Sequence, residues 1–309
     1  MAGFRVIEIA EAGRHLSAER GFLVVSDRER EIGRAPLEDI LAVVATGHGL
    51  TYTNALLVRL CELGAALVIC APNFRPVGWV WPMAGHHLQA GRMRVQSNAS
   101  EPLKKRVWQV LVRAKIQRQQ ATLEAEGKPA GGFGLLARSV RSGDPENIEA
   151  QAARRYWPLL MGPEFRRDTE GGGTNALLNY GYAVLRAATA RAVAGGGLHP
   201  SLGVHHANAE NAFCLVDDLM EPFRPVVDRI AAGLVAEGTA SLTPAAKAKL
   251  AGVVATDLLT EAGRTPVATC IERLVSSLVR AFESGDAELA LPLPGWPRIG
   301  DGGDPDDAC

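Results

Sequence analysis

The chain has 309 residues, of which 47% are apolar, and a formal net charge of −1. It is long and apolar enough to bury the core of one large domain or two smaller ones, which excludes an intrinsically disordered chain. The longest apolar runs are far shorter than the roughly 20 residues that span a bilayer, and the N-terminus lacks a signal-peptide pattern. We therefore expect a cytoplasmic protein without membrane segments.

Strand-like segments dominate the first 95 residues. They are short, rich in Val and Ile, and separated by Gly, Pro and charged turns, which is typical of β-strands. The segments are FRVIEIA, FLVVSD, ILAVVAT, AALVICA and VGWVWPM. One helix is predicted among them, over residues 53–64, because Thr53 can cap its N-terminus and Gly64 can end it.

Near residues 95–102 the pattern changes to helical periodicity. Apolar residues at helical spacing predict helices over residues 103–127, 147–162, 174–197 and 243–259. The C-terminal residues combine Pro, Gly and Asp without such spacing. We therefore expect an α+β protein with a small β-rich domain at 1–98, a larger all-α helical domain at 99–290, and an extended or disordered tail at 291–309.

Charge is distributed unevenly along the chain. Residues 101–190 carry 14 basic and 9 acidic side chains, whereas residues 191–309 carry 9 and 16. The basic third begins with a predicted helix on which Lys104 and Lys105 alternate with apolar residues, and several arginines follow it. Charged runs are commonly solvated faces, but basic clusters near a divalent cation are also what a phosphodiester substrate requires.

The stretch HHANAENAFCLVDDLMEPFRPVVD, residues 205–228, brings two histidines close to three carboxylates. On a helix over about 211–230, Glu221 shares a face with either Asp217 or Asp218. Pro222 lacks the N–H for a helical hydrogen bond, so a kink or a helix start is expected there. Alternatively, the two aspartates only cap this helix start, and His205 and His206 are polar loop residues.

A further carboxylate, Glu149, lies in the segment DPENIEAQAARRYW. Asp144 or Asn147 can cap a helix there, which places Glu149 in the first turn, where the helix dipole alone would also favour it. One imidazole and two carboxylates suit Mg²⁺ or Mn²⁺. A hard cation beside basic helices indicates phosphodiester chemistry.

These segments resemble a known family. IEAQAARRYW, TNALLNYGYAVLRA, LGVHHANAENAFCLVDDLMEPFRPVVD and the N-terminal FRVIEIA with PLEDILAVVATG are similar to the CRISPR-associated integrase, a metal-dependent nuclease that installs new spacers during CRISPR adaptation. The double histidine and DLMEPFRP resemble its type II branch. The resemblance covers the chain to about residue 290.

The resemblance implies a set of site residues. The family's metal-binding glutamate falls on Glu149, its histidine on His206 rather than His205, and its last carboxylate on Glu221, where many relatives have aspartate. Additional acidic candidates are Asp218, which matches a further acidic position of the family, and Asp217. Candidate DNA contacts are Arg154, Arg155, Arg166, Arg167, Arg224, Lys104 and Lys105.

The resemblance also implies an activity and partners. It implies dimerisation for the domain at 1–98 and metal-dependent catalysis for the domain at 99–290. We expect a Mg²⁺- or Mn²⁺-dependent DNA integrase and endonuclease, in which a 3′-hydroxyl of incoming DNA attacks a phosphodiester of a CRISPR repeat. Expected partners are duplex DNA, a second copy of the chain, a small ferredoxin-like CRISPR adaptation protein and, as a further candidate, the type II effector nuclease. Two other readings remain open: a stand-alone metal-dependent nucleotide phosphohydrolase and a non-catalytic DNA-binding scaffold.

Overall fold

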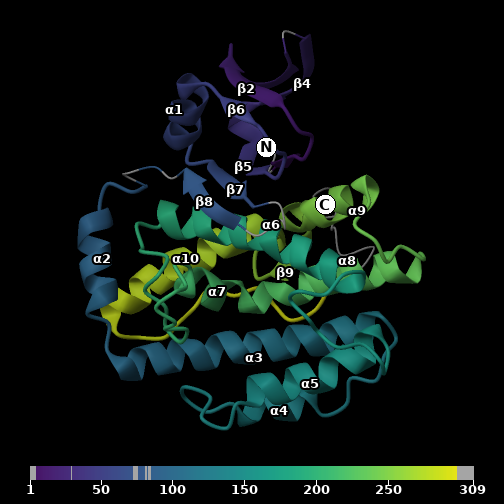
Figure 1. Cartoon of the computed structure of the whole chain (residues 1–309). Coiled ribbons are helices and arrows are strands. Elements are labelled where there is room, and N and C mark those ends of the chain that lie inside the picture. Colours follow the sequence, from purple (N-terminus) through teal and green to yellow (C-terminus); the bar gives the residue numbers. More distant parts are fainter. Residues whose placement is uncertain (1–4, 29, 72–75, 81, 83–84, 298–309) are drawn as a thin grey trace, which may run out of the picture.

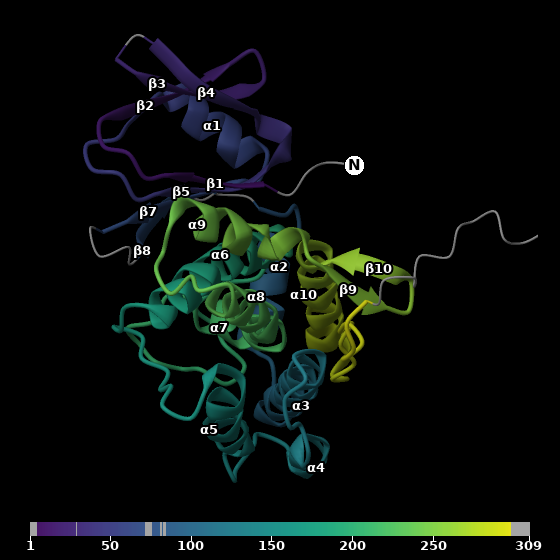
Figure 2. The same ribbon diagram turned by 90° about the vertical axis from the view of Figure 1, so that its right-hand side faces the viewer.

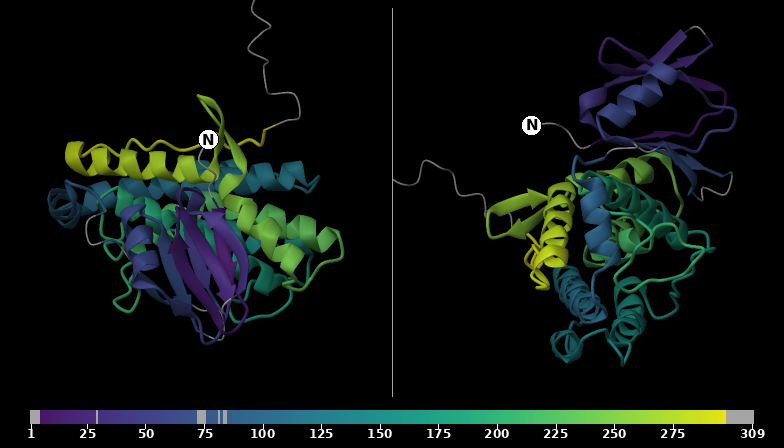
Figure 3. Two further views of the ribbon diagram at one scale, coloured as in Figure 1. Left: turned by 90° about the horizontal axis from the view of Figure 1, so that it is seen from above. Right: turned by 90° about the vertical axis from the view of Figure 1, so that its left-hand side faces the viewer.

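The computed structural model describes residues 5–28, 30–71, 76–80, 82 and 85–297. A β-rich N-terminal region stands on a body of packed helices (Figure 1). Viewed from the side, the N-terminal strands lie above the helices (Figure 3). The expected α+β class and the two-part layout agree with this arrangement.

Two sheets form the N-terminal region. The first has the order β1-β5-β7-β8, with β1, β5 and β7 parallel and β8 antiparallel at one edge: β1 (Arg5–Ile9), β5 (Ile40–Ala45), β7 (Ala66–Cys70) and β8 (Pro76–Val80). The second has the order β4-β3-β2-β6: β2 (Arg14–Glu19), β3 (Phe22–Asp27), β4 (Arg30–Pro36) and β6 (Thr51–Tyr52). A short 3₁₀ turn, η1 (Leu37–Asp39), leads into β5.

The five predicted strands are present as β1, β3, β5, β7 and β8. Three further strands, β2, β4 and β6, were not predicted. The first two have polar sequences, RHLSAE and REIGRAP, and β4 is mostly exposed, so they lack an apolar signal. Strands β2 and β4 form through pairing with β3. Tertiary contacts decide this pairing, and the local sequence pattern does not.

Strand β5 connects the two parts because all six of its residues are buried. Its side chains alternate between the faces of the sheet. Ala42 packs in the core of the helical body, and the adjacent Val43 packs in the core of the N-terminal region. A helix, α1 (Asn54–Glu62), covers the second core, and the Thr53 hydroxyl accepts a hydrogen bond from its third residue, which confirms the predicted cap.

The helical body is built around α6 (Thr174–Gly195), which packs against four other helices (Figures 1 and 2). A Cβ at Gly181 would lie 2.4 Å from Val227, so this close packing requires glycine. The other helices are α2 (Gln89–Ser97), α3 (Glu101–Ala125), α4 (Phe133–Ser139), α5 (Ile148–Met161), α7 (Cys214–Met220), α8 (Arg224–Ala236), α9 (Pro244–Ala251) and α10 (Val267–Ser284).

The expectation of an all-α second domain is wrong at one place. The helix predicted over 243–259 ends at Ala251, continues as a 3₁₀ turn, η3 (Gly252–Ala255), and gives way to strand β9 (Asp257–Thr260). Together with β10 (Gly263–Pro266) it forms an antiparallel hairpin beside α10 (Figure 2). Gly263 adopts a positive φ of 88° as β10 begins, a conformation that favours glycine.

The C-terminal segment carries no helix or strand over residues 286–297, as expected of an extended segment. It is nevertheless anchored to the body. The buried guanidinium of Arg118 donates hydrogen bonds to the carbonyls of Leu293 at 2.5 Å and Gly295 at 3.0 Å. The rest of the predicted tail, residues 298–309, lies outside the described residues.

Among the described residues, none of the helices combines the length and the hydropathy required to cross a membrane.

The N-terminal core supplies a test of the fold. Leu67 in β7 is 1% exposed in that core, so Leu67→Ala should lower the free energy of unfolding by about 2–5 kcal/mol. The control is Leu135→Ala in α4, because that side chain is 65% exposed and should change stability little. Urea denaturation followed by circular dichroism measures both. Equal stabilities of the two variants would contradict the assigned core.

Candidate functional site

A cavity of about 320 Å³ brings together the residues singled out in the sequence. It is lined by Glu149, His205, His206 and Glu221, with Trp108, Asp144 and Asn147 completing its wall. These side chains come from α3, the turn before α5, the first turn of α5, the loop before α7, and η2 (Glu221–Phe223). Segments far apart in the chain therefore converge at one place.

Glu149 is held by the turn that starts α5. Asp144 and Asn147 both adopt left-handed backbone conformations, with φ of 49° and 52°. The Asp144 carboxylate accepts hydrogen bonds from the N–H groups of Ile148 at 2.9 Å and Glu149 at 3.0 Å. Asn147 accepts one from the N–H of Ala150 at 3.3 Å. Both predicted capping residues are thus used, and together they fix the backbone of Glu149.

Glu221 lies at a break between two helices. The helix expected over about 211–230 is instead α7, the 3₁₀ turn η2 and α8. The break falls where Pro222 predicted a kink or helix start, since proline cannot donate the helical hydrogen bond. The break turns the Glu221 carboxylate toward α3, and the residue is only 6% exposed.

Asp218 organises the histidine loop and does not line the cavity. Its side chain is fully buried and accepts hydrogen bonds from the N–H groups of Val204, His205 and His206, at 2.7–3.2 Å. It also contacts Nδ1 of His206 at 2.6 Å. A Cβ at Gly203 would lie 2.3 Å from the carbonyl of His206, so the tight loop requires glycine there.

The contact with Asp218 also determines the protonation of His206. The hydrogen bond between them raises the pKa of the imidazole above its ordinary value, although partial burial acts against it. Because Nδ1 faces Asp218, Nε2 is the nitrogen left for a ligand. His205 stacks flat on the ring of Trp108, with centroids 4.1 Å apart, and burial lowers its pKa.

Asp217 points elsewhere, although it adjoins Asp218 in the chain. Arg186 lies 2.8 Å from its carboxylate, and Asn211 donates a further hydrogen bond at 2.8 Å. No side chain caps η2 or α8, so the alternative in which the two aspartates cap the helix start at Pro222 is wrong. The two neighbouring aspartates have separate structural partners.

Lys115 of α3 is part of the site, although it was not among the site residues predicted from the sequence. Its Nζ contacts both Glu149 and Glu221. Burial opposes its charge, but the attraction of Glu221 and Glu149 outweighs burial and raises the pKa of Lys115. Burial likewise acts against the charge of Glu221, but Arg224 and Lys115 hold its pKa below the ordinary value. The site is therefore a cluster of ionised groups.

The candidate DNA contacts differ in their surroundings. Arg155 donates to the carbonyl of Gly131, Arg166 to those of Pro163 and Phe165, and Lys104 pairs with Glu101. Arg167 bonds Asn179, whereas Arg224 lies 2.8 Å from Glu221. Within the described part of the chain, Arg154 and Lys105 are exposed and have neither an ion pair nor a side-chain hydrogen bond.

A second cavity, of about 640 Å³, adjoins the first at His206. Basic and aromatic side chains line it, together with residues of β5, β7 and β8; among them are Trp79, Arg167, Tyr180, Tyr182, Arg186 and Arg224. The N-terminal sheet thus forms one wall of this groove, and the helical body forms the other.

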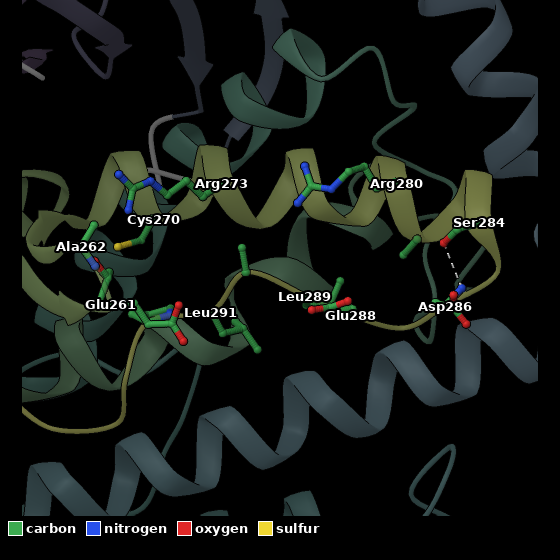
Figure 4. Close-up of a pocket in the computed structure, with 14 residues that line it drawn as sticks. Glu261, Ala262, Cys270, Arg273, Arg280, Ser284, Asp286, Glu288, Leu289 and Leu291 are labelled. Carbon is green, nitrogen blue, oxygen red and sulfur yellow. Dashed lines mark hydrogen bonds between the residues drawn. The ribbon is translucent and has the colours of Figure 1, made fainter.

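A larger cavity than that of the candidate site lies elsewhere, at about 730 Å³ between α10, the β9–β10 turn and the C-terminal segment (Figure 4). Arg273 and Arg280 project from α10, opposite Glu261 and Glu288. None of the residues singled out in the sequence lines it, and its charges are mixed. Size alone therefore does not identify the candidate site.

Tyr182 and Asp228 form a buried pair that contacts the site through Arg224. The hydroxyl of Tyr182 donates a hydrogen bond to Asp228, and the guanidinium of Arg224 lies over the Tyr182 ring, 4.8 Å from its centroid. Burial raises the pKa of Asp228 to about 7, although the bond from Tyr182 lowers it. A series of contacts therefore runs from Asp228 through Tyr182 and Arg224 to Glu221.

This pair generates a prediction for stability against pH. The pKa of Asp228 is about 7 in the folded chain, which is above the ordinary aspartate value of 3.8. The protonated carboxyl therefore contributes stability at low pH, and this contribution is lost as pH rises toward 7. Asp228→Asn should lose this pH dependence, so the stability of the wild type relative to the variant should fall between about pH 4 and about pH 7.

Urea denaturation at a series of pH values measures that difference. Glu237→Gln is the control, because Glu237 forms an exposed ion pair with Lys249 and should follow the wild type. A constant difference between the wild type and Asp228→Asn across this range would show that Asp228 does not titrate there.

Comparisons with known proteins identify the family of this chain. Residues 7–272 match the family model described as CRISPR associated protein Cas1. The chain is 37% identical over 289 residues to a CRISPR-associated endonuclease Cas1 from Neisseria meningitidis serogroup C, covering 92% of this chain and 94% of that protein.

Two solved structures share the fold. A casposase bound to its integration product superposes with a TM-score of 0.80 at 19% identity, covering 96% of each chain. A partial Cas6-RT-Cas1–Cas2 complex superposes with a TM-score of 0.60 at 18% identity, covering 94% of this chain and 98% of that one. By the family match and by its identity to the Neisseria protein, this chain belongs to the Cas1 family of CRISPR-associated proteins.

Proposed function

We propose that this protein is a metal-dependent DNA integrase and endonuclease that inserts spacer DNA into a CRISPR array. The observation that carries the proposal is the convergence of Glu149, Glu221 and His206 on one cavity. The ammonium group of Lys115 already contacts both carboxylates. Family membership and the likeness to an integrating casposase support the same activity.

The donor set fits Mg²⁺ or Mn²⁺. Carboxylate oxygens with one imidazole suit a hard divalent ion, and the histidine favours manganese. Glu221 is buried, and its Oε2 lies 2.5 Å from the ammonium group of Lys115, so this oxygen already serves a cation. Among the described residues, no three His, Cys, Asp or Glu side chains are already gathered as ligands, and the ammonium group of Lys115 contacts both Glu149 and Glu221.

Glu149, Glu221 and Nε2 of His206 would hold the ion. When bound, it would polarise a phosphodiester and stabilise charge on an attacking 3′-hydroxyl, or on water when the protein nicks DNA. Asp218 orients His206 for this purpose and keeps its Nδ1 occupied. The stacked rings of Trp108 and His205 form one wall of the cavity.

The basic and aromatic side chains that line the groove beside the site are suited to bind a single strand of DNA. Arginines can contact phosphates, and aromatic rings can stack on bases. Arg167 and Arg224 both lie over Tyr182, so their guanidinium groups are already oriented. Arg154 and Lys105, which lack partners among the described residues, are further candidates for duplex contacts.

Partners follow from the family. We propose a homodimer assembled through the N-terminal β-rich region, bridged by a small ferredoxin-like protein equivalent to the Cas2 named in the similar complex. The Neisseria relative and the double histidine favour the type II branch, in which the effector nuclease is a candidate partner. Since the substrate would be chromosomal DNA, we place the protein in the cytoplasm.

Site variants test the proposal. Glu149→Ala, His206→Ala and Glu221→Ala should each lower Mn²⁺-dependent strand transfer by about a hundredfold or more, because each removes a ligand. Integration of a labelled duplex into a repeat-containing plasmid, with the partner protein present, measures the rate. Glu237→Ala should leave the rate unchanged, because Glu237 pairs with Lys249 on the surface.

Other outcomes would contradict the proposal. Full activity in one of the three site variants would remove that residue from the site. Salt-sensitive DNA binding without any metal-dependent strand transfer by the wild type would instead indicate a scaffold. Cleavage of small nucleotides without a partner protein would indicate a stand-alone phosphohydrolase.

A further inference from the structure

The ammonium group of Lys115 lies between the two carboxylates of the site. It contacts Oε1 of Glu149, and it lies 2.5 Å from Oε2 of Glu221. Its own side chain is 10% exposed, and that of Glu221 is 7% exposed. Helix α3 carries Lys115 and packs against both α5 and η2, so three separate elements meet at this cation.

A buried carboxylate, Glu221, and a partly buried one, Glu149, meet at the same ammonium group. A carboxylate removed from water is strongly destabilised unless a counter-charge compensates it, and a second carboxylate nearby increases the cost. Arg224 approaches the other oxygen of Glu221, Oε1, at 2.8 Å. Among the described residues, Lys115 alone forms ion pairs with both Glu149 and Glu221.

We propose that Lys115 is a built-in counter-ion, which holds Glu149 and Glu221 in place without a divalent cation and gives way to the cation when it binds. The inference rests on the proposed metal site. A divalent ion held by both carboxylates competes for the oxygens that the ammonium contacts, Oε1 of Glu149 and Oε2 of Glu221.

Two consequences follow from this competition. The metal-free protein keeps its ligands in place, because Lys115 satisfies their charges. Metal binding is weaker than the ligands alone would allow, because the ion must displace a paired ammonium group. Lys115 is therefore a positioning residue, which acts through Glu149 and Glu221.

Lys115→Met separates these effects, because it keeps an unbranched side chain and removes the charge. In EDTA the variant should unfold at a lower temperature than the wild type, since two buried carboxylates lose their shared counter-ion. Mn²⁺ should then raise its unfolding midpoint more than that of the wild type. Isothermal titration with Mn²⁺ should give a dissociation constant lower by roughly fivefold or more.

Lys247→Met is the matched control. Lys247 pairs with Glu8 at 2.7 Å, and the two side chains are 18% and 12% exposed, so this ion pair is similarly shielded and lies outside the site. Its loss should also lower the midpoint in EDTA. Mn²⁺ should stabilise this variant no more than the wild type, which separates loss of a buried ion pair from loss of the counter-ion at the site.

If Lys115→Met folds only in the presence of Mn²⁺, that result itself supports the proposal. The dissociation constant of Mn²⁺ is then measured with a second variant, Lys115→Gln, which retains a hydrogen-bond donor. Binding of Mn²⁺ by both variants no more tightly than by the wild type would overturn it. Absence of Mn²⁺ binding in the wild type, or unchanged binding in Glu221→Ala, would instead overturn the proposed metal site.

Discussion

Two carboxylates, the buried Glu221 and the partly buried Glu149, share the ammonium group of Lys115 in this protein, and several elements of the helical body hold them there. Like charges at close range repel strongly away from water, so neither side chain would stay in place on a flexible support. The supports are accordingly rigid. Asp144 and Asn147 adopt left-handed conformations that fix the start of α5. Pro222 breaks the helix directly after Glu221, and the side chain of Glu221 turns toward α3.

Around this pair, other polar residues act as supports. Asp218 looks like a ligand in the sequence, yet its oxygens are occupied by three backbone N–H groups and by His206. Asp228 acts at a greater distance, by holding Tyr182 beneath Arg224. Each buried carboxylate therefore has a defined partner, which is what burial of charge requires.

The two-part architecture adds a second constraint. Because β5 is buried on both faces, the N-terminal sheet is packed onto the helical body through a shared core. The groove that adjoins the site at His206 lies along this junction, with Trp79 from the sheet and arginines from the body in its walls. The relative position of the two parts therefore determines the shape of the groove.

The sequence by itself determined the elements whose signals are local. Thr53, Asn147 and Pro222 marked where helices begin or break, because caps and proline act through neighbouring backbone groups. It also determined the candidate ligands, by their resemblance to a family. It did not predict β2, β4 or the β9–β10 hairpin, whose sequences carry weak or misleading patterns and whose hydrogen bonds depend on a partner strand. Only the tertiary structure decided that Asp217 and Asp218 diverge and that Lys115 joins the site, because ion pairing between segments distant in the chain depends on which helices pack together.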